Sequence, residues 1–139
     1  MLAWQTRRFL ELEVRREGAA IECRINAEDP ARDFQPSPGL VRVADWPAGE
    51  GVRVDTHITA GARVPPFYDS LLGKIIVHGP DRTTALTRLR RAIAATRIEG
   101  VATNLSFHAA VLEHPEFERG GVDTGFVARA LRGNAVPEA

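Results

Sequence analysis

The sequence has little cysteine, no long apolar run and no excess of either charge. Cys23 is the only cysteine among 139 residues, which excludes an internal disulfide framework. No uncharged apolar run approaches the roughly 18 residues of a membrane helix, and the N-terminus does not resemble a secretory signal. Eighteen basic residues balance eighteen acidic ones, which argues against a dominant role in binding nucleic acid or anionic membranes. We therefore expect a cytoplasmic protein without nucleic-acid or membrane partners.

Motifs of several common enzyme classes are also missing. The glycine pairs are too short for the phosphate loops of dinucleotide-binding or P-loop proteins. No Cys/His cluster has zinc-site spacing, and neither Ser37 nor Ser70 has the context of a nucleophile elbow. Lys74 is the only lysine, a bias more typical of a GC-rich genome than of a particular function. The residues by themselves indicate no metal or cofactor site.

The first half of the chain predicts short strands. The length and the mass of 15.2 kDa suit one domain. Apolar and polar residues alternate partly over residues 20–27, which predicts a strand with Cys23 on its buried face as a small core residue. Prolines and a glycine predict a loop over residues 28–39. Strands at 40–43, 52–58 and 71–78 would then form a small antiparallel barrel or sandwich.

The last third predicts helices. Asp81 is a suitable N-cap for a helix over residues 82–97, which carries an apolar stripe. Thr103 or Asn104 would cap a second helix that ends at Leu112, and a short last helix contains Phe126. The predicted fold class is therefore α+β, a small antiparallel β unit followed by two or three helices.

Three polar residues in the predicted strand 52–58 are the first candidate site. Arg53, Asp55 and His57 would share one face, with Val52, Val54, Thr56 and Ile58 on the other. A cation, a carboxylate and an imidazole on one face could bind an anion or transfer protons. A solvent-exposed strand with alternating charges is the structural alternative.

Two other segments have a functional and a structural interpretation. Residues 64–70 could form a rigid loop that positions Tyr68 or Lys74 against a ligand, or a structural turn. The arginine-rich helix 82–97 could be a partner interface or a solvated face, and it has too few aromatic neighbours to indicate nucleic-acid binding.

Several motifs resemble, in the same order, the C-terminal domain of biotin carboxylase. They cover roughly residues 18–127 and are Glu22-Cys23-Arg24-Ile25-Asn26-Ala27-Glu28-Asp29-Pro30, Phe34-Gln35-Pro36-Ser37-Pro38-Gly39, Gly51-Val52-Arg53-Val54-Asp55-Thr56-His57, Val64–Lys74, Asp81-Arg82, Glu99-Gly100-Val101-Ala102-Thr103-Asn104 and Phe117–Thr124. The resemblance implies a divergent lead at residues 1–17, the domain itself at 18–132 and a frayed tail at 133–139. It also implies the β-rich unit with trailing helices that the residue pattern predicts.

The resemblance implies a part in the ATP-dependent carboxylation of biotin by bicarbonate. In that family an ATP-grasp part holds the nucleotide, magnesium and bicarbonate sites, and none of its motifs occurs in this sequence. We therefore expect the chain alone to bind no cofactor and to be inactive, whereas biotin, ATP and magnesium serve the complete enzyme. The implied partners are the ATP-grasp part, the biotin carboxyl carrier protein, the carboxyltransferase and a second copy in a homodimer.

The resemblance assigns roles to five residues. Arg53 matches the arginine beside the ureido ring of biotin, where a guanidinium would stabilise the enolate-like oxygen. Asp55 and His57 match the same motif and are given orienting roles, and the segment from Tyr68 to Lys74 is interpreted as scaffold at a domain junction. His78 and Arg82 match the dimer contact region.

Two alternatives to a piece of a carboxylase stay open from the sequence. The chain could be a non-catalytic assembly or regulatory module that pairs with a full-length carboxylase, or a truncated gene product without its own function. The acceptor of the carboxyl group, such as an acyl-CoA, pyruvate or urea, would be chosen by other domains.

Overall fold

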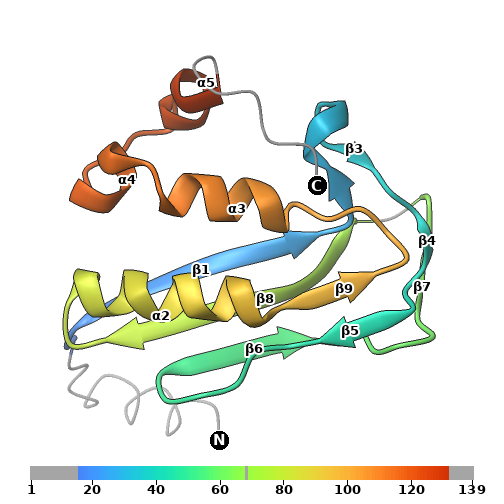
Figure 1. Cartoon of the computed structure of the whole chain (residues 1–139), viewed down its shortest axis with the longest axis horizontal. Coiled ribbons are helices and arrows are strands. Elements are labelled where there is room, and N and C mark those ends of the chain that lie inside the picture. The colour runs from blue at the N-terminus through green and yellow to red at the C-terminus, as the bar shows by residue number, and fades with distance from the viewer. Residues whose placement is uncertain (1–15, 68, 132–139) are drawn as a thin grey trace, which may run out of the picture.

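Three antiparallel strands form the central sheet of the computed structural model, which describes residues 16–67 and 69–131 (Figure 1). Their order is β1 (Ala19–Asn26), β8 (Leu71–Gly79), β6 (Val52–Thr56), so β8 lies in the middle. Because opposite residues of antiparallel strands share a face, the register that sets Cys23 and Val54 beside Ile75 gathers apolar side chains on one side. The predicted alternation is thus confirmed for β1 and β6, and the strand predicted at residues 71–78 is present as β8.

Six short strands form three two-stranded sheets beside the central one. They pair as β2 (Glu28–Asp29) with β3 (Gln35–Pro36), β4 (Gly39–Leu40) with β7 (Arg63–Val64), and β5 (Val43–Asp45) with β9 (Arg97–Glu99). A 3-10 turn, η1 (Pro30–Arg32), lies between β2 and β3 in the predicted loop. The predicted strand 40–43 is therefore divided between β4 and β5.

The helices follow the sheet. They are α2 (Arg82–Ala95), α3 (Leu105–Leu112), α4 (Pro115–Arg119) and α5 (Phe126–Leu131). As predicted, the Asp81 carboxylate caps α2, accepting a hydrogen bond from the Thr84 backbone N–H at 2.7 Å. Helix α2 ends two residues earlier than predicted because Arg97 pairs with Asp45 in β9, and α4 was not predicted. The α+β class with small antiparallel sheets is confirmed.

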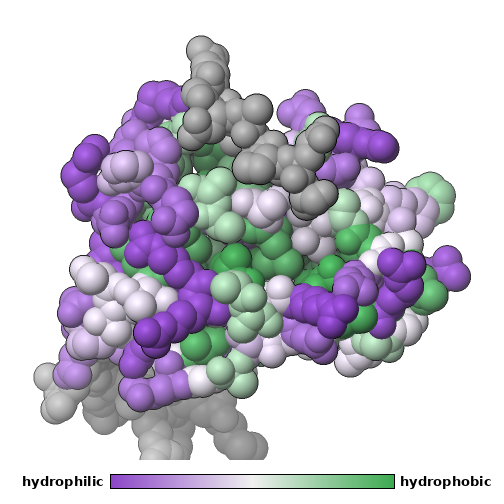
Figure 2. Space-filling model, in the orientation of Figure 1, coloured by the Kyte–Doolittle hydropathy of each residue, from purple (hydrophilic) through white to green (hydrophobic). Residues whose placement is uncertain are grey.

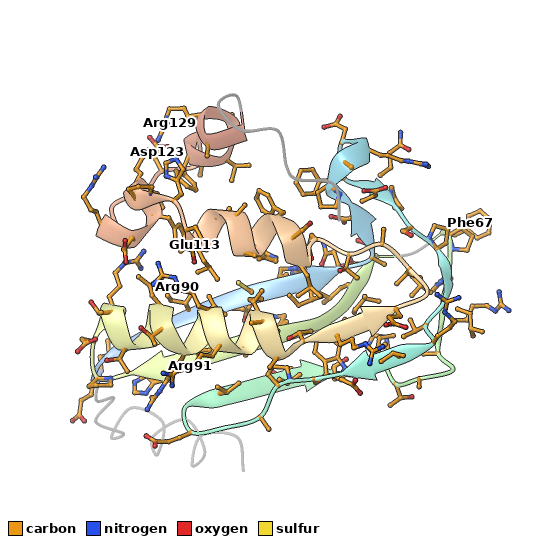
Figure 3. The ribbon with its side chains drawn as sticks, in the orientation of Figure 1. Phe67, Arg90, Arg91, Glu113, Asp123 and Arg129 are labelled. Atoms are coloured by element: carbon orange, nitrogen blue, oxygen red, sulfur yellow. The ribbon has the colours of Figure 1, made fainter. Side chains whose placement is uncertain are left out.

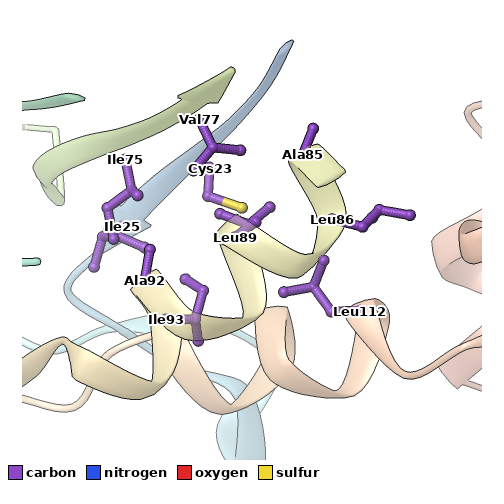
Figure 4. Close-up of a cluster of buried hydrophobic side chains, with 10 residues drawn as sticks. All are labelled: Cys23, Ile25, Ile75, Val77, Ala85, Leu86, Leu89, Ala92, Ile93 and Leu112. Carbon is purple, nitrogen blue, oxygen red and sulfur yellow. The ribbon is translucent and has the colours of Figure 1, made fainter. Parts of the chain in front are cut away.

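The main core lies between α2 and the central sheet (Figure 4). Leu89 is fully buried against the strand residues Ile75 and Val77, and Cys23 lies among them. Burial raises the pKa of the Cys23 thiol to about 11, with a smaller contribution from the charge of Glu22. The prediction that Cys23 is a small core residue is confirmed.

A second cluster of buried apolar residues lies under the small sheets. Its members are Ala27, Val41, Ile58, Val64 and Leu72. Ile58 belongs to this cluster rather than to the face of Val52 and Val54, because β6 ends at Thr56. The Thr56 hydroxyl donates to the Leu72 carbonyl oxygen at 2.7 Å and accepts from the Ile58 backbone N–H at 3.0 Å, which accompanies the end of the strand.

The helical side of the molecule presents α2 and α3 (Figure 2). Apolar residues lie in the centre of this view and polar ones around its rim. In the described ranges, no helix combines the length and apolarity that crossing a membrane requires. Most of the predicted lead 1–17 and all of the predicted tail 133–139 lie outside the described residues.

Candidate functional site

The face of the central sheet opposite α2 carries charged side chains in cross-strand rows. Lys74 in β8 lies directly between Arg24 in β1 and Asp55 in β6. In the next row Ile76 lies between Glu22 and Arg53. Arg53, Asp55 and Glu22 are exposed, in contrast to the buried apolar face beneath α2. The two rows bring together residues from three separate segments of the sequence.

Arg53 and Asp55 form a two-bond ion pair on this face. The Arg53 Nε donates to Asp55 Oδ1 at 2.9 Å, and Nη2 donates to Oδ2 at 2.6 Å. Two parallel bonds fix the plane of a guanidinium as well as its position. The alternation of β6 places both side chains on one face, as the sequence predicted.

The ion pair changes the protonation of both partners. Hydrogen bonding from Arg53 lowers the pKa of Asp55, and the positive charges of Arg53 and Lys74 lower it further. Hydrogen bonding to Asp55 raises the pKa of Arg53, and the charges of Asp55 and Glu22 act in the same direction. Both groups are therefore held in their charged forms.

Asp55 occupies only one edge of the guanidinium. An arginine has five N–H donors, and the pair with Asp55 uses one on Nε and one on Nη2. Within the described part of the chain, Nη1 makes no hydrogen bond. The Arg53 side chain is 72% exposed, so its second edge is accessible to an oxygen atom of a ligand.

The other two cations of the face also have carboxylate partners. Lys74 Nζ lies 3.5 Å from Glu22 Oε1, and Arg24 Nη2 lies 3.4 Å from Asp69 Oδ2. Three cations and three carboxylates thus form three ion pairs on this face. Four of these residues, Glu22, Lys74, Asp55 and Arg53, come from the two neighbouring cross-strand rows. We name this set of four the charge row.

His57 lies apart from this arrangement. It follows the end of β6 and is exposed. No hydrogen bond or ion pair links it to Arg53 or Asp55 in the described residues. The strand is shorter than predicted and ends before His57, so the structure shows the expected shared face for Arg53 and Asp55, and a place for His57 beside them stays a prediction.

His78 and Arg82 both have partners within the chain. His78 is exposed at the end of β8, with Nε2 2.8 Å from the Glu17 carbonyl oxygen. Arg82 is half-buried at the start of α2, where Nη2 donates to the Phe117 carbonyl oxygen at 2.5 Å. Its guanidinium lies 5.3 Å from the centre of the Phe117 ring, a cation–π contact. Arg82 thus joins α2 to α4.

The loop between β7 and β8 exposes Phe67, which is 88% accessible to solvent (Figure 3). The candidate residue Tyr68 lies outside the described residues. Asp69 closes the loop, since its Oδ1 accepts from the Leu71 backbone N–H at 3.0 Å while Oδ2 faces Arg24. Lys74 lies beyond the loop, on β8.

The described residues around Arg53 do not form a metal site. In residues 16–67 and 69–131, no three His, Cys, Asp or Glu side chains gather as metal ligands would. A groove of about 370 Å³ lies instead between residues 47–50 and α2, with Arg88 and Arg91 among its lining residues. This groove does not include Arg53 or Asp55.

Sequence comparison assigns the chain to a family. The model of the biotin carboxylase C-terminal domain matches residues 22–129. The chain belongs to this family. It is 48% identical to a biotin carboxylase of Nostoc sp. over 120 residues, which are 86% of this chain and 27% of that protein. It is 44% identical to a pyruvate carboxylase subunit of Methanothermobacter thermautotrophicus over 126 residues, 91% of this chain and 26% of that protein. The chain thus spans about a quarter of the length of these relatives.

Solved structures of biotin-dependent carboxylases have the same fold. Rhizobium etli pyruvate carboxylase, with its allosteric activator acetyl coenzyme A, matches with a TM-score of 0.82 and 35% identity. The match covers 86% of this chain and 12% of that one. The biotin carboxylase domain dimer of Hydrogenobacter thermophilus 2-oxoglutarate carboxylase, in complex with MgADP, ADP and bicarbonate, matches with a TM-score of 0.80 and 34% identity. That match covers 91% of this chain and 29% of the other.

Sequence reasoning did not place Glu22 and Lys74 beside Arg53 and Asp55. Within its own strand, each of Glu22 and Lys74 lies at a position that faces away from the buried side. Their distance from Arg53 and Asp55 depends on the register of β1 and β6 against β8, which no local pattern specifies.

Proposed function

We propose that this chain is the biotin-side part of a biotin carboxylase, in which Arg53 contacts the ureido oxygen of biotin. As a ring nitrogen of biotin loses its proton, negative charge develops on that oxygen. A preoriented guanidinium at this position would stabilise the charge. The observation that carries the proposal is the ion pair with Asp55, which fixes one edge of Arg53 and leaves the other accessible.

Asp55 fits the proposed site as an orienting residue. Its two hydrogen bonds hold the guanidinium before the substrate arrives, so that the contact needs no rearrangement. His57 has no comparable support, since it does not contact either residue in the described structure. We keep an orienting role for His57 only as a prediction from the motif.

The nucleotide, magnesium and bicarbonate would be held elsewhere in the enzyme. The acidic residues of the charge row face arginine and lysine partners at 2.6–3.5 Å, so they do not form a magnesium site. We propose that an ATP-grasp part supplies those sites, and that the carrier protein of biotin and a carboxyltransferase are further partners. Acceptor choice lies outside this domain in the proposal.

We also propose a homodimer through the region of His78 and Arg82, and a cytoplasmic location. The free thiol of Cys23 suits a reducing compartment. Arg82 binds the Phe117 carbonyl oxygen in α4, so its part in the proposed dimer would be to hold α4 in place beside the start of α2. Sedimentation of the 139-residue chain, with and without the substitution Arg82→Met, tests the dimer. A concentration-independent monomer would contradict it.

The proposed activity can be tested in a chimera. Residues 22–129 would replace the matched region of the Nostoc biotin carboxylase. We expect this chimera to carboxylate biotin with ATP and bicarbonate, and Arg53→Met to lower kcat about 100- to 1000-fold, as for the loss of one oxyanion donor. Arg24→Met, which removes another arginine of the same face, should keep near-parental activity. Full activity of Arg53→Met, or a folded but inactive parent chimera, would overturn the proposal.

The isolated chain provides a second test. We expect the 139-residue protein to show no ATP hydrolysis with biotin and bicarbonate, because catalysis in the proposal requires reactants positioned by several parts of the enzyme. ATP turnover by the pure chain would contradict this division of the site.

A further inference from the structure

Lys74 occupies the middle of the charge row. It lies directly opposite Asp55 across the β6–β8 pair, and its ammonium is 3.5 Å from Glu22 on the other side. Arg53 acts on Asp55 from within the same strand. Asp55 therefore has two cations beside it, of which only Arg53 forms hydrogen bonds with it among the described residues.

We propose that Lys74 is a positioning residue for Arg53, acting through Asp55. From its position opposite Asp55 across the β6–β8 pair, its charge attracts the Asp55 carboxylate, and that carboxylate holds the guanidinium of Arg53. Glu22 opposes this action, because it attracts Lys74 away from Asp55. The orientation of Arg53 is thus set by three strands rather than by β6 alone.

The charge row has few other groups that could replace Lys74. Among the described residues, the titratable or charged side chains on this face are Glu22 and Arg24 from β1, Lys74 and His78 from β8, Arg53 and Asp55 from β6, and Asp69 from the preceding loop. Arg24 is paired with Asp69, and Lys74 separates it from Asp55. His78 lies two rows further along β8. Helix α2 covers the opposite face. Lys74 is therefore the cation opposite Asp55.

The first test uses the full 139-residue chain. Carbon NMR of the carboxylates gives the pKa of Asp55, and proton exchange at the Nε of Arg53 reports how firmly the ion pair holds. In Lys74→Met we expect a higher pKa for Asp55 and faster exchange at Arg53, because a cation that lowers the carboxylate pKa is gone. Lys74→Arg should restore both values.

Two further variants make the test specific. Arg24→Met removes a cation from the same cross-strand row, on the side of Lys74 away from Asp55, and should leave both readouts unchanged. Glu22→Gln should shift the pKa of Asp55 downward, because Lys74 is then free to face it. Equal pKa and exchange values in Lys74→Met and in the unsubstituted chain would overturn the proposal. If Lys74→Met does not fold, Lys74→Gln and Glu22→Gln provide the same comparison.

The second test measures activity in the chimera, and there the inference rests on the proposed function. We expect Lys74→Met to lower kcat for biotin carboxylation about three- to tenfold with little change in KM, since Arg53 would act mainly in the transition state.

The outcomes separate the two proposals. Activity that survives Arg53→Met contradicts the proposed function. Activity that is lost in Arg53→Met, with a wild-type rate in Lys74→Met, contradicts the role of Lys74 alone.

Discussion

The side chain of Asn104 completes the hydrogen bonding of the backbone at Asn26, 78 residues earlier in the chain. Asn104 Oδ1 accepts from the Asn26 backbone N–H at 2.9 Å, and Nδ2 donates to the Arg24 carbonyl oxygen at 3.1 Å. In the other direction, the Asn104 backbone N–H donates to the Asn26 carbonyl oxygen at 3.2 Å. Asn104 thus extends the hydrogen bonding of β1 beyond the end of the sheet and attaches α3 to it.

Substitution of Asn104 should therefore destabilise the protein. Asn104→Ala leaves the Asn26 N–H without a partner in a site where Asn104 itself is only 7% exposed. We expect a loss of about 1–3 kcal/mol in the free energy of unfolding, measured by urea denaturation. The control Thr87→Ala removes an exposed side-chain bond to the Thr83 carbonyl oxygen and should cost less than about 0.5 kcal/mol. Equal losses in the two variants would contradict this role of Asn104.

Gly51 should resist substitution more strongly than Gly61. Both have positive φ, +67° and +90°, so alanine is strained at either position. A Cβ at Gly51 would also collide with the Arg88 guanidinium and the His78 carbonyl oxygen, which are hydrogen-bonded to each other. A Cβ at Gly61 would meet nothing. We expect Gly51→Ala to be less stable than Gly61→Ala by about 1–3 kcal/mol in thermal or urea unfolding. Similar stabilities would show that Arg88 moves aside without cost.

Cys23 should be almost unreactive in the folded protein. With a pKa of about 11, its thiolate fraction at pH 8 is lower by about two orders of magnitude than that of an ordinary cysteine. Burial limits access of a reagent as well. We expect modification by a disulfide reagent to be at least about 100-fold slower in buffer than in urea, followed by absorbance. Rapid modification of the native chain would mean that the sheet opens under native conditions.

His108 should make stability depend on pH. Its Nε2 lies 3.0 Å from the Arg24 carbonyl oxygen, so the ring donates a proton there. Burial lowers the pKa of His108, more than the bond to Arg24 raises it. The folded state therefore binds a proton less readily than the unfolded state. The contribution of His108 is fully present above the unfolded pKa of about 6.5 and is lost as the pH falls through the folded pKa.

The pH prediction is checked by urea unfolding between about pH 5 and pH 8. We expect His108→Gln to reduce the loss of stability on the acid side. His57→Gln removes an exposed histidine and serves as the control for composition. An unchanged pH profile in His108→Gln would place the acid sensitivity in other residues.

Local sequence patterns predicted the longer elements and only part of the candidate site. Helix α2 was predictable because its apolar stripe and the cap Asp81 are neighbours in sequence. Strand β9 was not, because its three residues become a strand only by pairing with β5, more than 50 residues earlier. Asn104 was predicted at a helix cap, and it occupies that position, but its side chain bonds β1 instead.

The same limit applies to the charged face. Arg53 and Asp55 were placed together because both lie in one strand, two residues apart. Glu22 and Lys74 joined them only once the three-stranded register was known. His57 was grouped with them because the alternating pattern continues to residue 58. The pattern does not show that β6 ends at Thr56, whose hydroxyl bonds to the Leu72 carbonyl oxygen and the Ile58 backbone N–H.

The strand order β1, β8, β6 also constrains how the protein forms. The central strand is the last of the three to leave the ribosome, so the two outer strands have no partner in this sheet until residue 79 is available. Their pairing spans long separations in sequence, which slows folding and leaves strand edges open in the meantime. A nascent chain that ends before β8 thus has neither the main core nor the face that holds Arg53. The sheet that holds Arg53 can therefore be completed only after more than half of the 139 residues have been made.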